Sequence, residues 1–511
     1  MIRLPTKPHL GIVGLSTLGA AIAFAILAVV VRLSGPAPVT ADDVPYYSRP
    51  FEGGPFAPGV LQTADGLLGD PHRMPAAADC KSCHEQAFAE WSTSLHSMAG
   101  IETIYERTEE RNMESKKRRH GVELTRYCES CHQPIELAMG RINPLPSVEP
   151  SPASADGVSC IVCHTTQASD PGNGNGALTY AFNELDRADL TGFLLAAPDR
   201  HATEMGRGRD LLASGDLCGG CHTQTDIPVV AEVDEVTPTQ TTYAEWADSW
   251  YAANGVTCQN CHMAEEPAAY IQALRHGDKA PPARVSHAFV GTNYLLTDID
   301  TFGDALYFLR GGVPAGMTGE AMKPLLRTQH RRTEELLRAA AEVEVTDAVI
   351  ANGGSGHARV TVRNVGAGHA IPSGVTDQKY MWLELRVTDA RGALVYDHGA
   401  FNPGNGTIPD DSVVWRERFL DRAGREITDH ITFQTRTVEH TRPAIPPRGE
   451  ATVAFDLALA DGATPPFTVS AKLWYRVATQ DLIARALRTD RVMPPFLMAE
   501  ATARLPTSLS N

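Results

Sequence analysis

The sequence predicts a multidomain α + β protein made of an N-terminal membrane helix, a mainly helical and irregular middle region and a C-terminal all-β domain. Three observations predict this organisation. An uncharged apolar run covers Gly11 to Val31, all ten cysteines fall between residues 80 and 262, and apolar and polar residues alternate in short segments beyond residue 358. A chain of 511 residues, 43% of them hydrophobic, has room for two or three domains with cores of their own.

The N-terminal run has the length of a membrane span. At about 1.5 Å per residue it matches a hydrocarbon core of roughly 30 Å. Arg3 and Lys7 precede it, so the positive-inside rule places the N-terminus in the cytoplasm. We expect residues 1–33 to be a retained signal-anchor in the inner membrane, with the bulk of the chain in the periplasm. The alternative is cleavage near Ala41, which would leave a soluble periplasmic or exported protein.

The next segment, residues 34–72, is rich in proline and glycine and is predicted to be a tether. Residues 73–296 then hold five copies of the pattern Cys-x-x-Cys-His, with no cysteine left over. Because every cysteine belongs to a copy, a disulfide framework is excluded. The ten cysteines are Cys80, Cys83, Cys128, Cys131, Cys160, Cys163, Cys218, Cys221, Cys258 and Cys261, and the histidines are His84, His132, His164, His222 and His262.

This pattern is typical of covalent c-type haem attachment. Two thiols form thioethers to the porphyrin vinyl groups, and the adjacent imidazole becomes the proximal iron ligand. Zinc ribbons give no reason for a histidine directly after each pair, and a redox dithiol would occur once. The sequence therefore predicts five covalently bound haem c groups in residues 73–296, where porphyrin faces would supply the apolar core that short, weakly periodic segments lack.

Each iron needs a second axial ligand if it is six-coordinate. The non-motif histidines between the first motif and residue 290 also number five, and we expect them to be distal ligands. His96 must serve a different haem from His84, because the helix predicted between them covers about 18 Å whereas two axial nitrogens lie about 4 Å apart. Ligation by Met98, Met139 or Met263 is the alternative. The five histidines are His96, His120, His201, His276 and His287.

Two further features stay open at this point. His369 lies in a Gly-Ala-Gly-His-Ala-Ile-Pro turn, where it either pins the turn to the haem region or reaches across as a haem ligand. The basic run Lys116 to Arg119 lies beside His120, either as a solvated face or as a propionate clamp or docking patch.

Helix formers dominate residues 297–342, which we expect to be bracing helices, in particular over 328–341. Residues 343–511 show a period of two and are expected to form an immunoglobulin-like β-sandwich held by packing alone, with a turn at Asp389 to Gly392. The predicted strands are 358–362, 380–387, 431–435, 451–455 and 467–474.

These residues carry a family resemblance. The first motif, Cys80 to His84, followed by Trp91-Ser92-Thr93-Ser94-Leu95-His96, resembles the opening motif of the cytochrome c-554 and hydroxylamine-oxidoreductase superfamily over roughly residues 75–290. The resemblance implies that His96 is the distal ligand of a later haem and that haems are closely packed in pairs. It also implies a downstream β-sandwich of the kind appended to exported multihaem cytochromes. No Cys-x-x-Cys-Lys motif, which some catalytic members use, is present.

The net charge of −16 excludes nucleic acid as a partner class, because a phosphate backbone would be repelled. We expect a periplasmic, membrane-anchored pentahaem cytochrome that relays electrons between a membrane donor, such as a quinol-oxidising complex, and a periplasmic or extracellular acceptor. Two alternatives are a reductase or oxidase of a small nitrogen or sulfur compound at a haem with an open distal face, and an electron-transfer subunit of a larger assembly.

Overall fold

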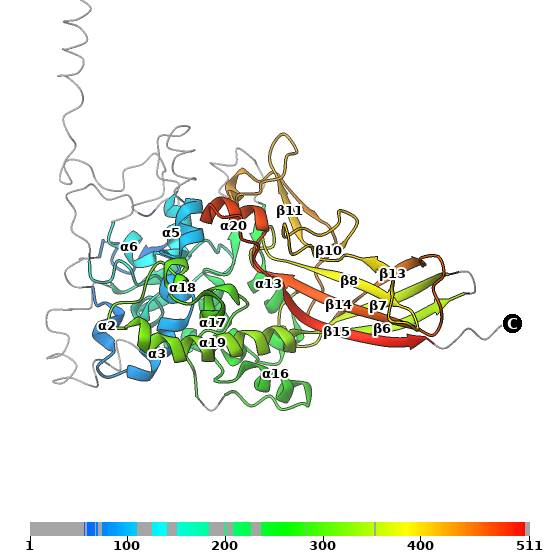
Figure 1. Ribbon diagram of the computed structural model, residues 1–511. Helices are drawn as coiled ribbons and strands as arrows, with labels where there is room; N and C mark the ends of the chain where they lie inside the picture. Colours follow the sequence, from blue (N-terminus) through cyan, green and yellow to red (C-terminus); the bar gives the residue numbers. More distant parts are fainter. Residues whose placement is uncertain are drawn as a thin grey trace, which may run out of the picture.

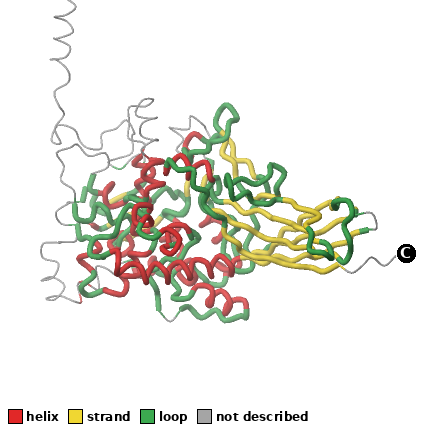
Figure 2. Tube along the Cα trace, in the orientation of Figure 1, coloured by secondary structure: helices red, strands yellow, loops and turns green. Residues whose placement is uncertain are grey.

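The computed structural model describes residues 56, 59–66, 68–69, 74–109, 125–140, 151–182, 199, 201, 208–225, 237–282, 284–351 and 354–505. The N-terminal apolar run, Ala41, the basic run at 116–119 and His120 lie outside these residues, so those predictions stay predictions. Within the described residues, helices gather at one end of the molecule and strands at the other (Figures 1 and 2). No described helix is long and apolar enough to cross a bilayer.

The helical half consists of short elements joined by irregular chain. Three of the five motifs lie entirely on helices of five to eight residues, whereas the first and the fourth begin at the end of a short helix. The helices are α2 (Ala77–Cys80), α3 (Glu85–Thr93), α5 (Thr125–His132), α6 (Pro134–Ala138), α7 (Cys160–His164), α10 (Arg209–Leu212), α11 (Gly215–Gly219), α13 (Thr242–Ala247), α14 (Trp250–Ala253), α15 (Cys258–His262), α16 (Pro267–Arg275), α17 (Ile299–Phe302) and α18 (Ala305–Leu309), with single 3₁₀ turns η1 (His96–Met98) and η4 (Leu295–Thr297).

Part of the segment predicted as a tether belongs to this half. Strand β1 (Gln62–Thr63) pairs in parallel with β3 (Leu178–Tyr180), which also pairs with β2 (Thr166–Ser169). Phe56 and Leu61 are buried against the apolar cluster that surrounds α6. The tether prediction is therefore wrong for these residues, because two buried apolar side chains anchor a stretch whose composition otherwise resembles a linker. A further two-stranded ribbon joins β4 (Gln224–Thr225) to β5 (Pro238–Gln240).

The long helix α19 (Gly319–Ala340) confirms the predicted helix at 328–341 except for its last residue, and it begins nine residues earlier. Its N-cap is Thr318, whose side chain accepts a hydrogen bond from the backbone N–H of Ala321 at 3.2 Å. Apolar residues along one face, among them Met322 and Leu326, are fully buried. Figure 1 shows α19 running from α3, past α16, to the base of the strands, so it connects the two halves.

The C-terminal half contains two antiparallel sheets. One has the order β10-β8-β14-β15, with β9 also paired to β8, and the other has the order β13-β7-β6. A separate hairpin joins β11 and β12. The strands are β6 (Ala341–Ile350), β7 (Ser355–Asn364), β8 (Tyr380–Thr388), β9 (Leu394–His398), β10 (Val413–Trp415), β11 (Glu417–Leu420), β12 (Thr437–His440), β13 (Glu450–Ala458), β14 (Phe467–Arg476) and β15 (Phe496–Leu505), and helix α20 (Gln480–Leu487) follows β14.

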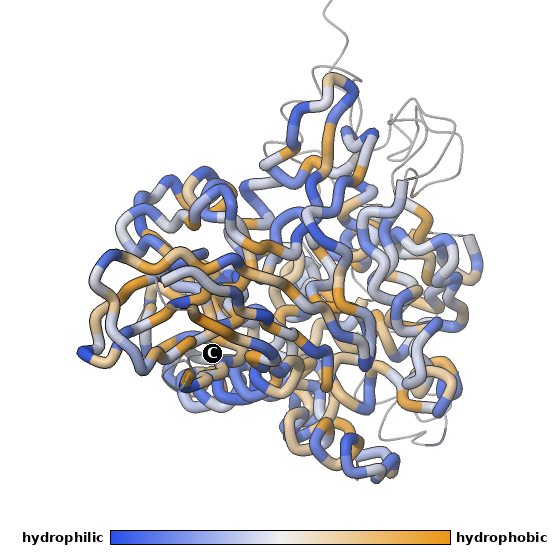
Figure 3. The backbone as a smooth tube through the Cα atoms, turned by 90° about the vertical axis from the view of Figure 1, so that its right-hand side faces the viewer, coloured by the Kyte–Doolittle hydropathy of each residue, from blue (hydrophilic) through white to orange (hydrophobic). Residues whose placement is uncertain are grey.

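The two sheets enclose a common core. Register pairs Val360 with Val453 in one sheet and Leu383 with Leu473 in the other, and all four side chains are buried in one apolar cluster. Burial alternates along β13 and β14, so each presents one buried face, whereas the first six residues of β8 are all buried. Figure 3 shows apolar and polar residues interspersed along the chain. The same cluster includes Leu306 of α18, so the bracing helices and the sheets share one core.

Four of the five predicted strands are confirmed within β7, β8, β13 and β14. The predicted strand at 431–435 is wrong, because residues Thr432–Gln434 form a 3₁₀ turn, η5. The predicted turn after β8 is confirmed: Gly392 has a φ of 76°, and the carboxylate of Asp389 accepts from the backbone N–H of Ala393 at 3.0 Å.

Candidate functional site

The five Cys-x-x-Cys-His motifs come together in the helical half although up to 180 residues separate them. A hydrogen bond with Cys80 raises the pKa of the Cys160 thiol, one with Cys131 raises that of Cys221, and one with Cys258 raises that of Cys218. Burial, and to a lesser degree the nearby Cys221 thiolate, raises the pKa of Cys163 to about 12. All ten are free thiols. Each motif therefore has its attachment points close to those of another.

Four motif histidines face a second histidine. The ring centroids of His84 and His201 lie 6.3 Å apart, those of His222 and His96 lie 6.5 Å apart, and those of His164 and His287 lie 6.4 Å apart. His262 faces His369 at 6.3 Å, with the two ring planes within 8° of parallel. These four distances agree to within 0.2 Å.

An iron atom fits between the rings of each pair. A metal–imidazole bond is about 2.0 to 2.1 Å long, and a ring nitrogen lies about 1.1 Å from the ring centroid, given ring bonds of about 1.35 Å. Two imidazoles on opposite sides of one metal therefore have centroids about 6.3 to 6.5 Å apart. The observed separations match, and a direct stack of two rings at van der Waals contact would be far shorter, so the donor set fits a six-coordinate haem iron.

The protonation state also suits ligation. Burial lowers the pKa of His96 to about 4, and the motif histidines His262 and His132 act in the same direction. Burial likewise lowers the pKa of His132 to about 4. These imidazoles are therefore neutral near pH 7, which is the form that binds a metal.

Hydrogen bonds at Nδ1 orient several of these rings. His262 Nδ1 lies 2.7 Å from the carbonyl oxygen of Val290, and His132 Nδ1 lies 2.7 Å from that of Ala99. His369 Nδ1 lies 2.8 Å from the carbonyl oxygen of Ala370. An N–H at Nδ1 that donates to a carbonyl fixes the tautomer and leaves Nε2 as the free donor atom for a metal.

His96 is held by the end of helix α3. The helix ends at Thr93, and the completely buried guanidinium of Arg310 donates to the carbonyl oxygens of Ser92 and Thr93 at 3.0 and 3.2 Å. Phe289 contacts the His96 ring edge to face, with centroids 4.5 Å apart. The local fold thus carries His96 away from His84 and toward His222, as the length of the intervening helix requires.

His287 is positioned by an ion pair between chain segments far apart in sequence. The carboxylate of Glu90 accepts from the backbone N–H of His287 at 2.8 Å and also binds the guanidinium of Arg284. Arg284 in turn pairs with Glu265 at 2.8 Å. Burial opposes ionisation of Glu90, but these contacts hold its pKa below the usual value. A charged Glu90 therefore ties the His287 segment to helix α3.

His369 belongs to the sheet half and reaches the helical half through a pinned turn. The carboxylate of Glu245 on α13 accepts from the backbone N–H of Ala370 at 3.1 Å and from the hydroxyl of Ser373 at 2.7 Å. Thr242 and Ser373 hydroxyls lie 2.8 Å apart. Both interpretations of this turn from the sequence therefore have support, since the turn is fixed to the helical half and its imidazole faces His262.

The remaining sequence-predicted residues lie elsewhere. His276 is exposed at the C-terminal end of α16, and no ring contact joins it to a motif histidine among the described residues. Met98 and Met139 are buried within apolar clusters, and Met263 follows α15 as its C-cap residue. The second motif differs from the others, because His132 stacks directly on Tyr105 with centroids 4.1 Å apart.

Comparison with known proteins agrees with this geometry. A family model described as cytochrome c554 and c-prime matches residues 79–165, which include the first three motifs. This match and the five motifs support a multihaem c-type cytochrome. The structure of the chain is similar to that of a penta-heme cytochrome c552 from Thermochromatium tepidum, with a TM-score of 0.51 and 19% identity over 85% of this chain and 100% of that chain. No curated protein matched.

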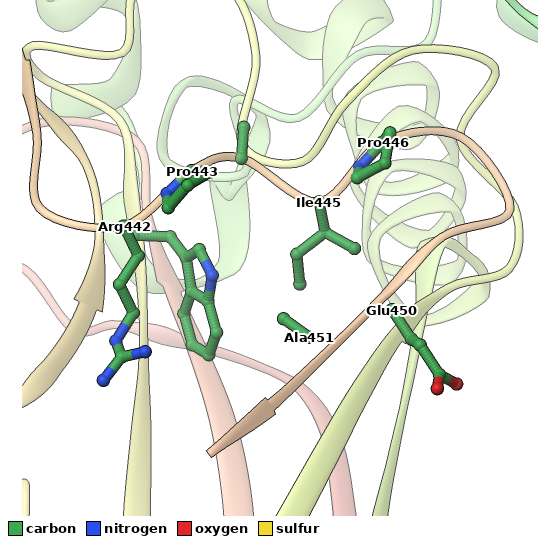
Figure 4. A pocket seen from close by; sticks show the side chains of 8 residues that line it. Arg442, Pro443, Ile445, Pro446, Glu450 and Ala451 are labelled. Atoms are coloured by element: carbon green, nitrogen blue, oxygen red, sulfur yellow. The ribbon is translucent and has the colours of Figure 1, made fainter.

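A surface pocket of about 250 Å³ lies in the sheet half of the protein (Figure 4). It is lined by Trp415, by residues 442–446 and by Glu450 and Ala451, and its lining contains neither cysteine nor histidine. The charged groups of Arg442 and Glu450 lie on opposite sides of it. This pocket therefore offers none of the groups that the haem sites require.

Proposed function

We propose that this cytochrome binds five haem c groups and relays single electrons from a membrane donor to a periplasmic or extracellular acceptor. The observation that carries the proposal is the set of four facing imidazole pairs at iron-spanning distance, each containing a motif histidine. Electron transfer is what the match of residues 79–165 to a cytochrome family model implies. The number of haems, the compartment and the partners are the proposed part.

The proposed axial pairs are His84 with His201, His164 with His287, His222 with His96, and His262 with His369. This set replaces the exposed His276 by His369, and His120 remains a prediction outside the described residues. Each haem would be fastened by the two cysteines of its motif. Haem c supplies an iron that exchanges one electron between ferric and ferrous states, and two imidazole ligands favour a low reduction potential.

The protein's own contribution is rigidity. Hydrogen bonds from Nδ1 to the carbonyls of Val290 and Ala370 fix two rings, and the Glu90 contact fixes the segment that carries a third. Rings held in this way keep the same ligand set in both oxidation states. Little rearrangement then accompanies electron exchange, which suits a relay better than a catalyst that must open a coordination position.

The contacts among the thiols also favour a relay. Attachment points of the first and third motifs meet at Cys80 and Cys160, and those of the third and fourth come close at Cys163 and Cys221. The fourth motif further contacts the second through Cys131 and the fifth through Cys258. Every motif is thereby connected, with the fourth at a branch point, so no haem would be isolated from the others.

We propose that residues 1–33 anchor the protein in the inner membrane and that redox partners dock through basic surfaces. The net charge of −16, to which haem propionates would add, supports a basic partner face. A quinol-oxidising membrane complex is the expected donor. Membership in a larger cytochrome assembly is compatible with the same axial pairs.

Haem counting and spectroscopy test the proposal. The intact mass of the native protein and a pyridine haemochrome assay should both give five haems per chain. Ferric electron paramagnetic resonance should show low-spin haem that is inert to nitrite, cyanide and hydroxylamine. A count well below five would refute the pentahaem assignment. A high-spin signal that shifts with these ligands would instead favour the reductase or oxidase alternative. The haem of the second motif is the candidate for such a site, because His132 stacks on Tyr105 instead of facing a second imidazole.

A further inference from the structure

The haem site of the second motif has no facing imidazole at the distance seen in the other four, among the residues that the structure describes. Tyr105 lies 4.1 Å from His132, centroid to centroid, with planes within 8° of parallel. A ring stacked this closely lies beside the proximal imidazole and not across an iron from it. The second axial ligand of this haem is therefore either His120, which lies outside the described residues, or a residue of another element.

His430 is a histidine of the sheet half that no sequence motif distinguishes. It lies in the loop between β11 and β12, and its φ of 58° is in the left-handed region, which non-glycine residues rarely occupy. Such a backbone persists only where surrounding contacts enforce it, and it is often found at functional sites. The loop is packed through Ile427, Ile431 and Phe419, which form a small apolar cluster of their own.

The Nδ1 atom of His430 is bound to a carboxylate. It lies 3.0 and 2.9 Å from the two carboxylate oxygens of Asp377, which is fully buried and also accepts from the side-chain amide of Gln378 at 3.0 Å. The pKa of Asp377 stays below its usual value despite burial, because His430 and neighbouring donors favour the anion. A histidine that ligates a metal commonly donates its other ring N–H to a carboxylate in this way.

The other ring nitrogen of His430, Nε2, has no hydrogen-bond partner within the described part of the chain. The arrangement thus leaves one unpaired donor atom on a ring whose orientation is fixed. The other face of the site belongs to the second motif. The His430 side chain is 27% exposed, and hydrogen bonds bring its loop to this motif.

Direct contacts independently bring the His430 loop to the helix of the second motif. The hydroxyl of Thr432 accepts from the side-chain amide of Gln224 at 2.9 Å. The adjacent Thr225 accepts, at its backbone carbonyl, a hydrogen bond of 2.5 Å from the hydroxyl of Tyr127, which precedes Cys128 on α5. Two hydrogen bonds through β4 therefore connect the loop after β11 with helix α5.

We infer that His430, oriented by Asp377, is the sixth ligand of the haem attached at Cys128 and Cys131. This inference rests on the proposed binding of five haems and adds a second ligand from the sheet half, beside His369. The sheets then complete two haem sites, which gives the C-terminal half a direct role in the redox centre. Asp377 is a positioning residue, since it acts on the iron only through the imidazole of His430.

Spin state is the main test. In the purified holoprotein, His430→Ala should convert one haem in five to a high-spin form, observed by ferric electron paramagnetic resonance, and added imidazole should restore the low-spin signal. His440→Ala is the matched control, because His440 lies in the same half with 51% of its side chain exposed and pairs only with Glu417 among described residues. That variant should leave all spectra unchanged.

Two further variants separate ligation from folding. His430→Met replaces one axial ligand by another and should keep the haem low-spin, with a new sulfur-to-iron charge-transfer band and a raised potential. Asp377→Asn weakens the acceptor for Nδ1–H and should raise the potential of one haem in a redox titration, whereas Asp410→Asn at an exposed position should not. A purely structural pair would alter stability without these signatures.

The outcomes are distinguishable from failure of the pentahaem proposal. If the wild-type protein holds fewer than five haems, that proposal fails first. If it holds five, and His430→Ala keeps five unaltered low-spin signals, the inference about His430 is overturned. A high-spin haem already present in the wild-type protein would overturn it as well. If His430→Ala loses haem altogether, two other measurements test whether His430 is a ligand. His430→Met should show the sulfur-to-iron charge-transfer band, and near-infrared magnetic circular dichroism of the wild-type protein should show five bis-imidazole haems. Absence of either result overturns the inference.

Discussion

Replacing Arg310 by methionine tests how the fold presents His96. The Arg310 side chain is completely buried, and its guanidinium donates to the carbonyl oxygen of Leu296 at 2.8 Å and to that of Thr93 at 3.2 Å. The carbonyls at the end of α3 have no partner within the helix, and a cation near them is favoured by the helix dipole. Arg310 therefore acts as the cap of the segment that leads to His96.

The magnitude follows from the groups that the substitution leaves behind. Burial lowers the pKa of Arg310 to about 9, so the site disfavours the cation unless the carbonyl contacts offset the loss of water. Methionine has similar bulk but no donor, and it leaves the carbonyls of Leu296 and Thr93 without a partner among the described residues. Each unsatisfied buried acceptor costs about 1 to 3 kcal/mol, so for the two carbonyls we expect the free energy of unfolding to fall by about 2 to 6 kcal/mol.

Urea unfolding of the holoprotein, followed by tryptophan fluorescence that haem quenches in the folded state, measures this change. The matched control is Arg327→Met, because Arg327 is 55% exposed and pairs with the exposed Asp300 at 2.8 Å. Such a surface pair contributes about 0 to 1 kcal/mol. If Arg310→Met is as stable as Arg327→Met, within about 0.5 kcal/mol, the capping argument for the His96 segment is refuted.

Three other predictions follow from the same structure. His369→Ala should make one haem high-spin, with His357→Ala, an exposed histidine of β7, as the silent control; unchanged spectra would remove His369 from the axial pairs. Burial raises the pKa of Asp156 from 3.8 to about 6, so the native state binds more protons between these values, and stability should fall as pH rises through this window. Asp156→Asn should flatten that slope in urea titrations at pH 4 and pH 7, and an unchanged slope would contradict the assignment. Leu473→Ala at a fully buried position of β14 should cost about 2 to 5 kcal/mol in unfolding free energy, whereas Thr468→Ala on the same strand, half-buried, should cost far less; equal losses would contradict the sandwich core.

Local patterns in the sequence predicted much of the fold. Alternation over residues 380–387 and 467–474 predicted β8 and β14, and the helix formers before Ala341 predicted α19. The prediction of a strand at 431–435 was wrong because alternation over five residues does not distinguish a strand from a turn whose side chains are buried by neighbours. Residues 56–63 were assigned to a tether because their composition is loop-like, and only packing of Phe56 and Leu61 against the helical half anchors them.

The candidate site divides in a similar way. The cysteine spacing alone predicts covalent haem, since the thioether chemistry needs two thiols and an imidazole within five consecutive residues, and this requirement is local. The length of the helix after His84 also excluded His96 as a ligand to the same iron. Which histidine faces which is not a local property, because an axial pair joins residues that are as far apart as His262 and His369.

The sequence by itself therefore determined the attachment chemistry, the alternating strands and the long helix, because each of these depends on residues close together in the chain. Tertiary structure alone decided that His276 lies at the surface, that His369 faces a motif histidine and that Asp377 orients His430. The physical reason is that an iron accepts any imidazole within bonding reach, and reach is set by how two halves of the molecule pack.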